Sequence, residues 1–204
     1  MSNISTKADF YTAVENRRSH YVISKDFVAS DEKIQEIVEF AVKHIPTAFN
    51  SQTGRVVILL GEQHDKLWDL TTETLRAVVP ADSFASTQEK MDLFKAGYGT
   101  VLFFEDQSIV RGLQEQFALY ADNFPVWSEQ ASGILQFTVW TALEAEGFGA
   151  TLQHYNPLID EKVASEWNVP GDWKLIAQMP FGKPVAPAGD KEFSPLENRV
   201  KVYK

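Results

Sequence analysis

Residues 128–146 read SEQASGILQFTVWTALEAE, and this stretch decides the fold. Its large apolar residues fall on most faces of a helix rather than on one stripe: Ile134, Leu135, Phe137, Val139, Trp140 and Leu143. A helix that is apolar all round is normally a buried one. Gln136 and Glu144 interrupt it, so it is too short and too polar to cross a bilayer. The stretch therefore predicts a central helix, ended by Gly147 and Gly149, that other elements cover.

Several apolar runs predict the strands of a sheet. VVILL at 56–60 and GTVLFFE at 99–105 are continuous and rich in β-branched or aromatic residues, which is typical of strands buried on both faces. ATLQHY at 150–155 and KLIAQMPFG at 174–182 are expected to add two strands, and VKVY at 200–203 a short last one.

Helical patterns separate these runs. The clearest lies at 31–45, where Ser30 can cap the helix, apolar residues recur at i, i+3, i+4 and i+7, and Pro46 ends the pattern. Further helices are expected at 6–18, 66–79, 88–95 and 107–121. Helices that alternate with strands and include one buried helix predict a three-layer α+β fold, with residues 1–204 as a single domain. Neither GxGxxG nor GxxxxGK[ST] occurs, so the pattern does not indicate a Rossmann or P-loop domain.

Composition restricts the class of function. The chain of 204 residues is 44% hydrophobic, as in globular proteins, and its net charge of −9 argues against nucleic acid or an anionic membrane as a partner. The absence of cysteine excludes disulfides and thiolate chemistry, and the four histidines have no metal-ligand spacing, so no metal is expected. MSNISTKADF lacks the apolar core of a signal peptide, which predicts a cytoplasmic protein.

Three separated motifs occur in order. ENRRSHY (15–21) ends the first helix, PTAFNSQTGR (46–55) follows the second, and FGKP (181–184) precedes NRVKVY (198–203). Together with LQEQFALYADNFPVWSEQASG (113–133), this set resembles the flavin-dependent nitroreductase family, in the branch of the fungal fatty-acid-repression proteins and their bacterial relatives. The resemblance implies a mixed, mostly antiparallel sheet, a homodimer with FMN at each subunit interface, and a C-terminal strand exchanged between subunits.

The resemblance also assigns the phosphate-binding residues. Arg17, Arg18 and Ser19 would bind the FMN phosphate, with Lys183 and Arg199 approaching from the C-terminal segment. Arginine suits this role because its guanidinium can bind an oxyanion through two N–H groups. The alternative is that Arg17 and Arg18 satisfy the last carbonyls of the first helix.

PTAFNSQTGR carries more hydrogen-bonding side chains than a connector needs. The resemblance places Phe49 beside the flavin, together with four polar residues: Asn50, Ser51, Gln52 and Arg55. Amides match the donors and acceptors of the flavin pyrimidine edge, and an arginine there would stabilise the charge of the reduced ring. In the family this loop reaches the partner's flavin. The alternative is an ordinary turn with Gln52 in solvent.

The family also uses LQHYNP (152–157) and a set of aromatic residues. The resemblance places Gln153 and His154 near flavin N5 and O4, although a lone histidine at a strand end is often simply packed or solvated. Tyr120, Phe124 and Trp127 would form an apolar wall for a planar acceptor, the alternative being ordinary core residues.

The resemblance implies an FMN-dependent NAD(P)H oxidoreductase linked to stress response. It would reduce nitroaromatics, quinones or similar planar acceptors in a ping-pong reaction that requires no catalytic side chain, since the cofactor carries the hydride. A flavin- or lipid-binding sensor with little turnover is the main alternative, with the apolar helix of residues 128–146 lining its pocket. A flavin-fragmenting or dehalogenating enzyme ranks third.

Overall fold

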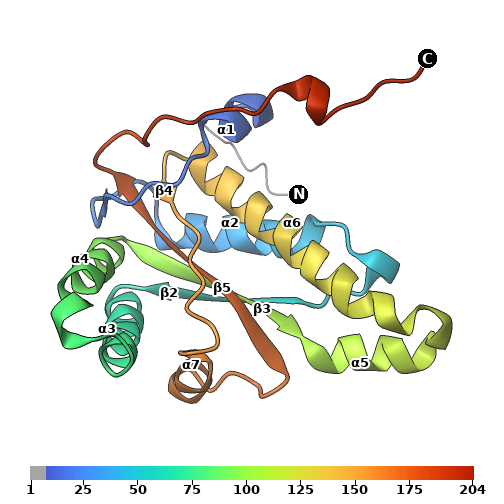
Figure 1. The fold of residues 1–204 in the computed structure, drawn as a ribbon, viewed down its shortest axis with the longest axis horizontal. Coiled ribbons are helices and arrows are strands. Elements are labelled where there is room, and N and C mark those ends of the chain that lie inside the picture. The colour runs from blue at the N-terminus through green and yellow to red at the C-terminus, as the bar shows by residue number, and fades with distance from the viewer. Residues whose placement is uncertain (1–7) are drawn as a thin grey trace.

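An antiparallel sheet forms the middle layer of the computed structural model, which describes residues 8–204 (Figure 1). Its strands lie in the order β1 (Ile23–Ser24), β5 (Trp173–Pro184), β3 (Gly99–Asp106) and β2 (Gly54–Leu60), and β4 (Gly149–Ala150) pairs with the end of β5. Every pairing between these strands is antiparallel. β2 is therefore an edge strand, and β3 and β5 are central.

The burial of β3 on both faces explains why the sheet needs a helical layer on each side. All eight of its residues are buried. Val101 and Phe103 belong to one hydrophobic cluster, whereas Leu102 and Phe104 belong to another on the opposite face, as the two-residue period of a strand requires. Each face must be covered by helices, which gives the three layers.

The first helical layer contains α1 (Phe10–Asn16), α2 (Asp31–His44) and α6 (Phe124–Ala145). α2 begins as predicted, because the Ser30 hydroxyl accepts a hydrogen bond from the Lys33 amide at 3.3 Å. α6 crosses this face of the sheet and contributes Leu135, Val139 and Leu143 to the core (Figure 1). α5 (Gln107–Gln116) and the 3₁₀ segment η3 (Ala118–Asn123) connect β3 to α6.

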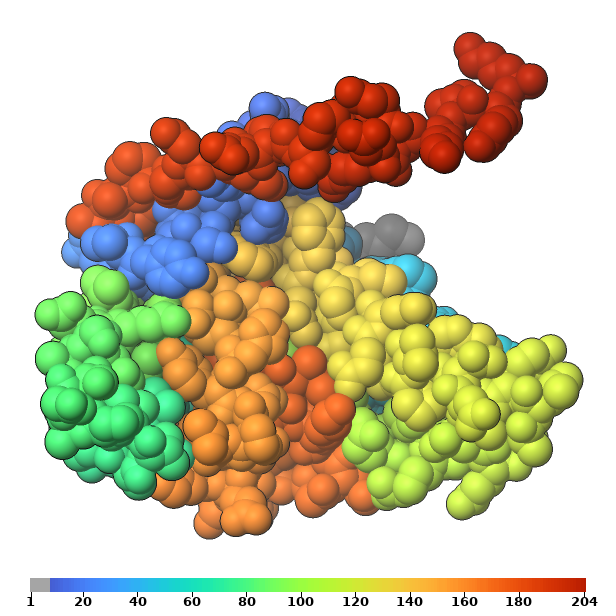
Figure 2. All heavy atoms as spheres, in the orientation of Figure 1, coloured from blue at the N-terminus to red at the C-terminus, as the bar shows by residue number. Residues whose placement is uncertain are grey.

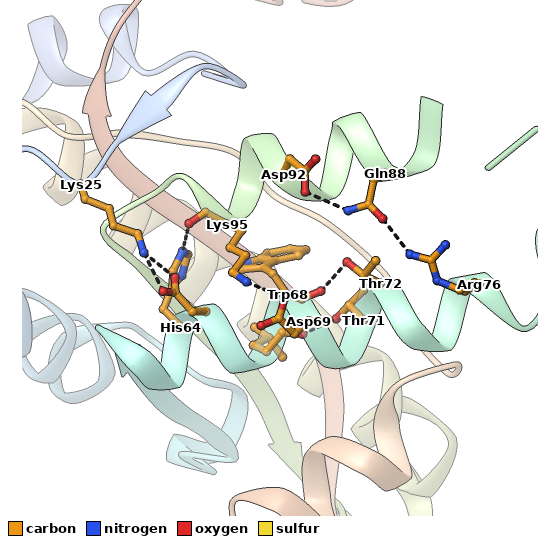
Figure 3. A network of polar contacts seen from close by, with 12 residues as sticks. Lys25, His64, Trp68, Asp69, Thr71, Thr72, Arg76, Gln88, Asp92 and Lys95 are labelled. Atoms are coloured by element: carbon orange, nitrogen blue, oxygen red, sulfur yellow. Dashed lines mark hydrogen bonds and ion pairs between the residues drawn. The ribbon is translucent and has the colours of Figure 1, made fainter. Parts of the chain in front are cut away.

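The second layer contains α3 (Glu62–Arg76), α4 (Phe84–Lys95) and α7 (Asp160–Glu166). A polar network joins α3 and α4 to the sheet (Figure 3). The buried His64 contacts the Thr100 hydroxyl through Nδ1 at 2.9 Å and the Lys95 carbonyl through Nε2 at 3.2 Å, and the Trp68 indole donates to the same hydroxyl at 3.0 Å. Burial lowers the pKa of His64 to about 4.

The predicted three-layer α+β fold with a mostly antiparallel sheet is thus confirmed, but the burial of the central helix is not complete. Ile134 and Phe137 of α6 are each 40% exposed. The expectation of a helix buried on all faces is wrong within one chain, because no other element of the described residues covers this side.

Three strand predictions also need correction. VVILL was expected to be buried on both faces, but only Leu59 of β2 is buried, since β2 lies at the edge of the sheet. ATLQHY forms regular strand only at β4, followed by a single bridge between Gln153 and Gln178. Residues 200–203 form no strand, because no strand within residues 8–204 pairs with them.

The remaining differences concern boundaries and short elements. The first helix covers Phe10–Asn16 rather than 6–18, with Asp9 accepting a hydrogen bond from the Thr12 amide at 3.1 Å; positions 6 and 7 lie outside the described residues. α3, α4 and α6 each begin four residues earlier than predicted, and α5 ends five residues earlier. β1 and α7 were not predicted. The short 3₁₀ segments are η1 (Ala48–Asn50), η2 (Ala81–Ser83) and η4 (Leu196–Asn198).

The last twenty residues form an extended tail. It crosses α1, and its end projects away from the rest of the chain (Figures 1 and 2). Its large apolar residues are 60–88% exposed: Val185, Phe193, Leu196, Val200, Val202 and Tyr203. The tail therefore buries less than half of this apolar surface against its own chain.

Candidate functional site

The loop after α2 has an unusual backbone. Phe49, Asn50 and Gln52 have φ values of 55°, 51° and 48°, in the left-handed region that residues other than glycine seldom adopt. Such residues cost about 1–3 kcal/mol each and persist only where the surroundings hold them. Three of them within four positions indicate a loop shaped for a purpose other than connecting α2 to β2.

Hydrogen bonds on the inner side of the loop hold this shape. The backbone N–H of Gln52 donates to the Thr47 hydroxyl at 3.1 Å, and the Arg55 guanidinium donates to the backbone carbonyl of Gln52 at 2.8 Å. Arg55 also pairs with Asp106 at the end of β3, at 3.1 Å. The side chains of Asn50 and Gln52 are exposed, and Ser51 is half-buried. Arg55 therefore holds the backbone of the loop, while the side-chain amides of Asn50 and Gln52 are exposed to solvent.

Phe49 joins the loop to a group of rings. Its centroid lies 5.0 to 5.9 Å from those of four aromatic residues between the end of α5 and the start of α6: Phe117, Tyr120, Phe124 and Trp127. We call these five residues the aromatic cluster. Phe49 and Trp127 are stacked, with planes 22° apart, and Phe49 is half-exposed. The structure brings together all four aromatic residues that the sequence singled out, and adds Phe117.

A buried carboxyl group lies beneath the loop. Glu105 is 1% exposed, and its Oε2 accepts a hydrogen bond from the Ser128 hydroxyl at 2.6 Å. Burial raises the pKa of Glu105, while the hydroxyls of Ser128 and Thr53 act in the opposite direction. Ser128 follows Trp127, so this hydrogen bond joins β3 to the start of α6, and the backbone of Glu105 pairs with Gly54 at the end of the loop.

The second group of predicted residues lies at the end of α1. The Ser19 backbone forms a bridge with Ala150 next to β4, and the amide of His20 donates to the Ala150 carbonyl at 3.0 Å. Arg18 donates a hydrogen bond to the Gly189 carbonyl of the tail. Arg17 is the C-cap of α1, and its backbone amide donates to the Ala13 carbonyl at 2.9 Å. Neither the Arg17 nor the Arg18 side chain bonds to an α1 carbonyl, so the cap uses the Arg17 backbone and leaves both guanidinium groups for other contacts.

Arg17 instead packs on α6. Its guanidinium carbon lies 4.5 Å from the ring centroid of Trp140, and its side chain makes no hydrogen bond or ion pair within the described residues. Burial lowers the pKa of Arg17, and the neighbouring Arg18 charge acts in the same direction. Two further buried nitrogens, His20 Nδ1 and Trp140 Nε1, also have no hydrogen-bond partner among residues 8–204.

The other predicted site residues differ in their surroundings. Gln153 is buried, and its amide donates to the Thr151 hydroxyl at 3.0 Å, whereas His154 is exposed beside a cleft of about 470 Å³. Lys183 on β5 lies 3.6 Å from Asp26, and Arg199 is exposed on the tail.

Within one chain, the aromatic cluster and Arg17 are far apart. Phe49 contacts Trp127 and Arg17 contacts Trp140, thirteen positions further along α6. At 1.5 Å per residue the two contacts are about 20 Å apart along the helix. The loop and the α1 end therefore do not form one compact pocket in a single chain.

The residues present nevertheless fit FMN. The Arg17 guanidinium is charged and partly desolvated and has no hydrogen-bond or ion-pair partner among residues 8–204, which suits a phosphate dianion. The exposed amides of Asn50 and Gln52 suit the hydrogen-bonding edge of a flavin ring.

These features of residues 8–204 suit a flavin-binding oxidoreductase. Residues 14–183 match the model of the nitroreductase family, and the chain belongs to this family.

The relatives agree in fold and length. CinD from Lactococcus lactis, solved with nicotinic acid, is 54% identical with a TM-score of 0.90, over 96% of this chain and all of CinD. HBN1 and the nitroreductase FRM2 of Saccharomyces cerevisiae are 35% and 34% identical over 98% of this chain and all of each yeast protein. The predicted relation to the fungal branch is confirmed.

FMN is the cofactor typical of this family. One solved relative, a nitroreductase from Desulfovibrio desulfuricans that shares the fold at 17% identity and a TM-score of 0.68, is itself a complex with FMN. In the part of the chain that the structure describes, no helix is long and apolar enough to cross a membrane, and no group of three His, Asp or Glu side chains could hold a metal ion.

Proposed function

We propose that this protein is an FMN-dependent NAD(P)H oxidoreductase that reduces nitroaromatics, quinones or similar planar acceptors. The observation that carries the proposal is the pairing of a free, partly buried Arg17 with a strained loop that directs amides outward. The first feature suits the FMN phosphate and the second suits its ring. Among residues 8–204, the Arg17 guanidinium and the Asn50 side chain have no hydrogen-bond partner, and the side-chain amide of Gln52 donates only to the Asn50 carbonyl, at 3.4 Å.

Each group has its own task in this proposal. Arg17, Arg18 and Ser19 bind the phosphate, with Lys183 and Arg199 adding positive charge. Asn50, Ser51 and Gln52 bind and orient the ring of the partner's flavin, and Arg55 holds their loop through the Gln52 carbonyl. Gln153 and His154 lie in the segment proposed to flank the ring. When bound, FMN supplies the hydride-transferring centre, at which NAD(P)H and the acceptor react in turn.

The aromatic cluster supports a planar acceptor. A half-exposed Phe49 above Trp127 offers an apolar surface on which an aromatic ring can stack. CinD has been solved with chloramphenicol and with 4-nitrophenol, both nitrobenzene derivatives, and with nicotinic acid, which has the ring of the nicotinamide donor. By analogy, we propose that Tyr120, Phe124 and Trp127 bind nitroaromatic acceptors in this protein.

A homodimer would bring the two halves of the site together. The exposed apolar side chains of α6, Ile134 and Phe137, offer a contact surface for a second copy. A groove of about 740 Å³ runs between α2 and the free edge of β2, with Asp31, Glu32 and Glu39 on its α2 side. The groove lining also includes Lys43 and Arg55. Residues 198–204 of the tail carry Arg199, Lys201 and Lys204 and no acidic side chain, so this end of the partner's tail could meet the three carboxylates as an added strand.

The lipid-sensor alternative finds little support. The groove lined by α1 and α6, between Phe10 and Phe137, has a volume of about 240 Å³. Ligand sites usually span about 300–1,000 Å³, so this groove is small for a fatty acyl chain. A cytoplasmic location, a single domain over residues 1–204 and a part in stress response stay predictions from the sequence.

The proposal is tested by an absorbance spectrum of the purified protein, followed by anaerobic addition of NADH and, separately, NADPH. We expect a flavin spectrum that bleaches within seconds and returns on addition of menadione or 4-nitrophenol. A flavin that is not bleached would favour the sensor. A colourless protein that does not take up FMN would contradict the proposal.

A further inference from the structure

The contact between Arg17 and Trp140 has a specific geometry. The guanidinium carbon lies 4.5 Å from the centroid of the indole ring, well within the range of a cation–π contact. Trp140 comes from the core helix α6, whereas Arg17 is the residue that follows α1. The ring is fixed because it packs against the hydrophobic cluster that α6 forms with the sheet.

A cation–π contact restrains an arginine without using its hydrogen-bond donors. The ring attracts the positive charge, and the five N–H groups of the guanidinium stay free. A carboxylate partner would restrain Arg17 equally well, but it would occupy two of these donors. The other arginine of the motif, Arg18, illustrates the difference, because it already donates to the Gly189 carbonyl.

No charged group of residues 8–204 forms an ion pair with Arg17, so the Trp140 ring is what restrains its guanidinium. Glu144 lies one helical turn after Trp140, yet it forms no ion pair with Arg17. Burial raises the pKa of Glu144, whereas His20 and Arg17 act in the opposite direction. An acidic group therefore lies close to Arg17 while Trp140, and not Glu144, holds the guanidinium.

We propose that Trp140 is a positioning residue for the FMN phosphate and thereby makes the site prefer FMN over riboflavin. The indole holds Arg17 with its N–H groups directed at the ligand, so part of the entropy cost of ordering this long side chain is met before the ligand binds. The inference rests on the proposed function, in which Arg17 binds the phosphate. It concerns only the phosphate, since Trp140 has no assigned contact with the flavin ring.

The test compares the dissociation constants of FMN and riboflavin, which differ only in the phosphate, for Trp140→Leu, Trp140→Phe and the unmodified protein. We expect Trp140→Leu to weaken FMN binding roughly 2- to 30-fold, as expected for loss of a cation–π contact. Riboflavin binding should change less than about twofold, and Trp140→Phe, which keeps an aromatic face, should restore most of the preference for FMN.

Trp173→Leu is the matched control. Trp173 also lies beneath an arginine, at 5.7 Å from the Arg55 guanidinium carbon, but Arg55 is held by Asp106 and by loop carbonyls. This variant should leave the ratio of FMN to riboflavin affinity unchanged. Circular dichroism spectra would establish that each variant is folded.

A double-mutant cycle completes the test. If Trp140 acts through Arg17, Trp140→Leu should change FMN affinity much less in an Arg17→Ala background. An unchanged FMN preference in Trp140→Leu, or an equal loss for both ligands, would overturn the inference and leave the proposed function standing. Failure of the unmodified protein to bind FMN would overturn the proposed function and the inference with it.

Discussion

Glu105 shows how one buried side chain can make stability depend on pH. Its pKa is raised, mainly by burial, so the folded protein binds this proton more tightly than the unfolded chain does. The stabilisation that the neutral carboxyl group contributes is complete below its ordinary pKa of about 4.5 and is lost as the pH rises through the raised value. Each tenfold increase in the proton affinity of this carboxyl group on folding corresponds to about 1.4 kcal/mol.

We therefore expect Glu105→Gln to gain stability relative to the unmodified protein as the pH rises. Glutamine keeps the size and a hydrogen-bonding group for Ser128 but cannot ionise, so the two proteins should differ little at pH 4 and most at pH 8. Urea unfolding at both values measures the difference. Glu73→Gln, which alters an exposed carboxylate that is paired with Arg76 and is not among the groups that shift the pKa of Glu105, is the control. A difference that does not change with pH would contradict this role of Glu105.

At the residue scale, sequence identified side chains by chemical type but not by their partners. Phe49, Tyr120, Phe124 and Trp127 were singled out and do meet in one cluster. The partner of Arg17 was missed. Trp140 is more than one hundred positions away and lies in a helix whose apolar pattern already accounts for an indole, so the sequence contained no signal for the contact.

At the scale of elements, the α3–α4 layer depends on a neutral histidine. The direction of each hydrogen bond follows from chemistry. The Lys95 carbonyl can only accept, so His64 Nε2 donates to it, and Nδ1 of the neutral ring then accepts from the Thr100 hydroxyl (Figure 3). The same hydroxyl accepts from the Trp68 N–H. Protonation of Nδ1 would prevent this atom from accepting the hydrogen bond from the Thr100 hydroxyl. The low pKa of His64, about 4, is caused mainly by burial.

The direction of the pH dependence differs from that of Glu105. Unfolded His64 binds a proton near pH 6.5 and the folded form only near 4, so stability is lost as the pH falls through this window. The difference corresponds to an upper limit of about 3 kcal/mol. We expect His64→Gln to be less stable than the unmodified protein at pH 7.5 but to lose less stability on going to pH 4.5, as measured by urea unfolding. His44→Gln, on an exposed face of α2, is the control and should not change this slope.

Long elements were predicted well, whereas short or unpaired ones were not. α2, β3 and α6 carry strong periodicity or long apolar runs, so each was recognised with boundaries within four residues. β1 has only two residues, too few to show any period. Residues 200–203 have a strand-like composition, but a strand also needs a neighbour, and the described part of the chain supplies none.

For the whole molecule, the exposed tail predicts a dependence of flavin binding on assembly. Removal of residues 196–204 should weaken the proposed dimer and reduce the FMN retained after gel filtration, because the tail would no longer cover β2 of the partner. Sedimentation velocity and the flavin absorbance of the dimer fraction measure both effects. A truncated protein that stays dimeric and yellow would exclude this role for the tail.

Point variants distinguish strand addition from a simple loss of charge. In an added strand, Val200 and Val202 share one face and Lys201 lies on the other. If that face packs on the partner, Val200→Ser with Val202→Ser should weaken the dimer at least about tenfold, since burying a valine contributes about 1.5–3 kcal/mol. Lys201→Ser, the matched control, should have a much smaller effect at physiological salt.

The position of β3 in the sheet has a consequence for how the protein is made. β3 is fully buried, and its second neighbour, β5, follows it by roughly 70 residues. At about 5–20 residues per second, the ribosome needs several seconds to produce that neighbour. Throughout this interval the nascent chain carries an apolar strand with an open edge, the feature that most readily pairs with another chain. Production in a cell should therefore benefit from slower synthesis at low temperature and from chaperones that bind apolar strands.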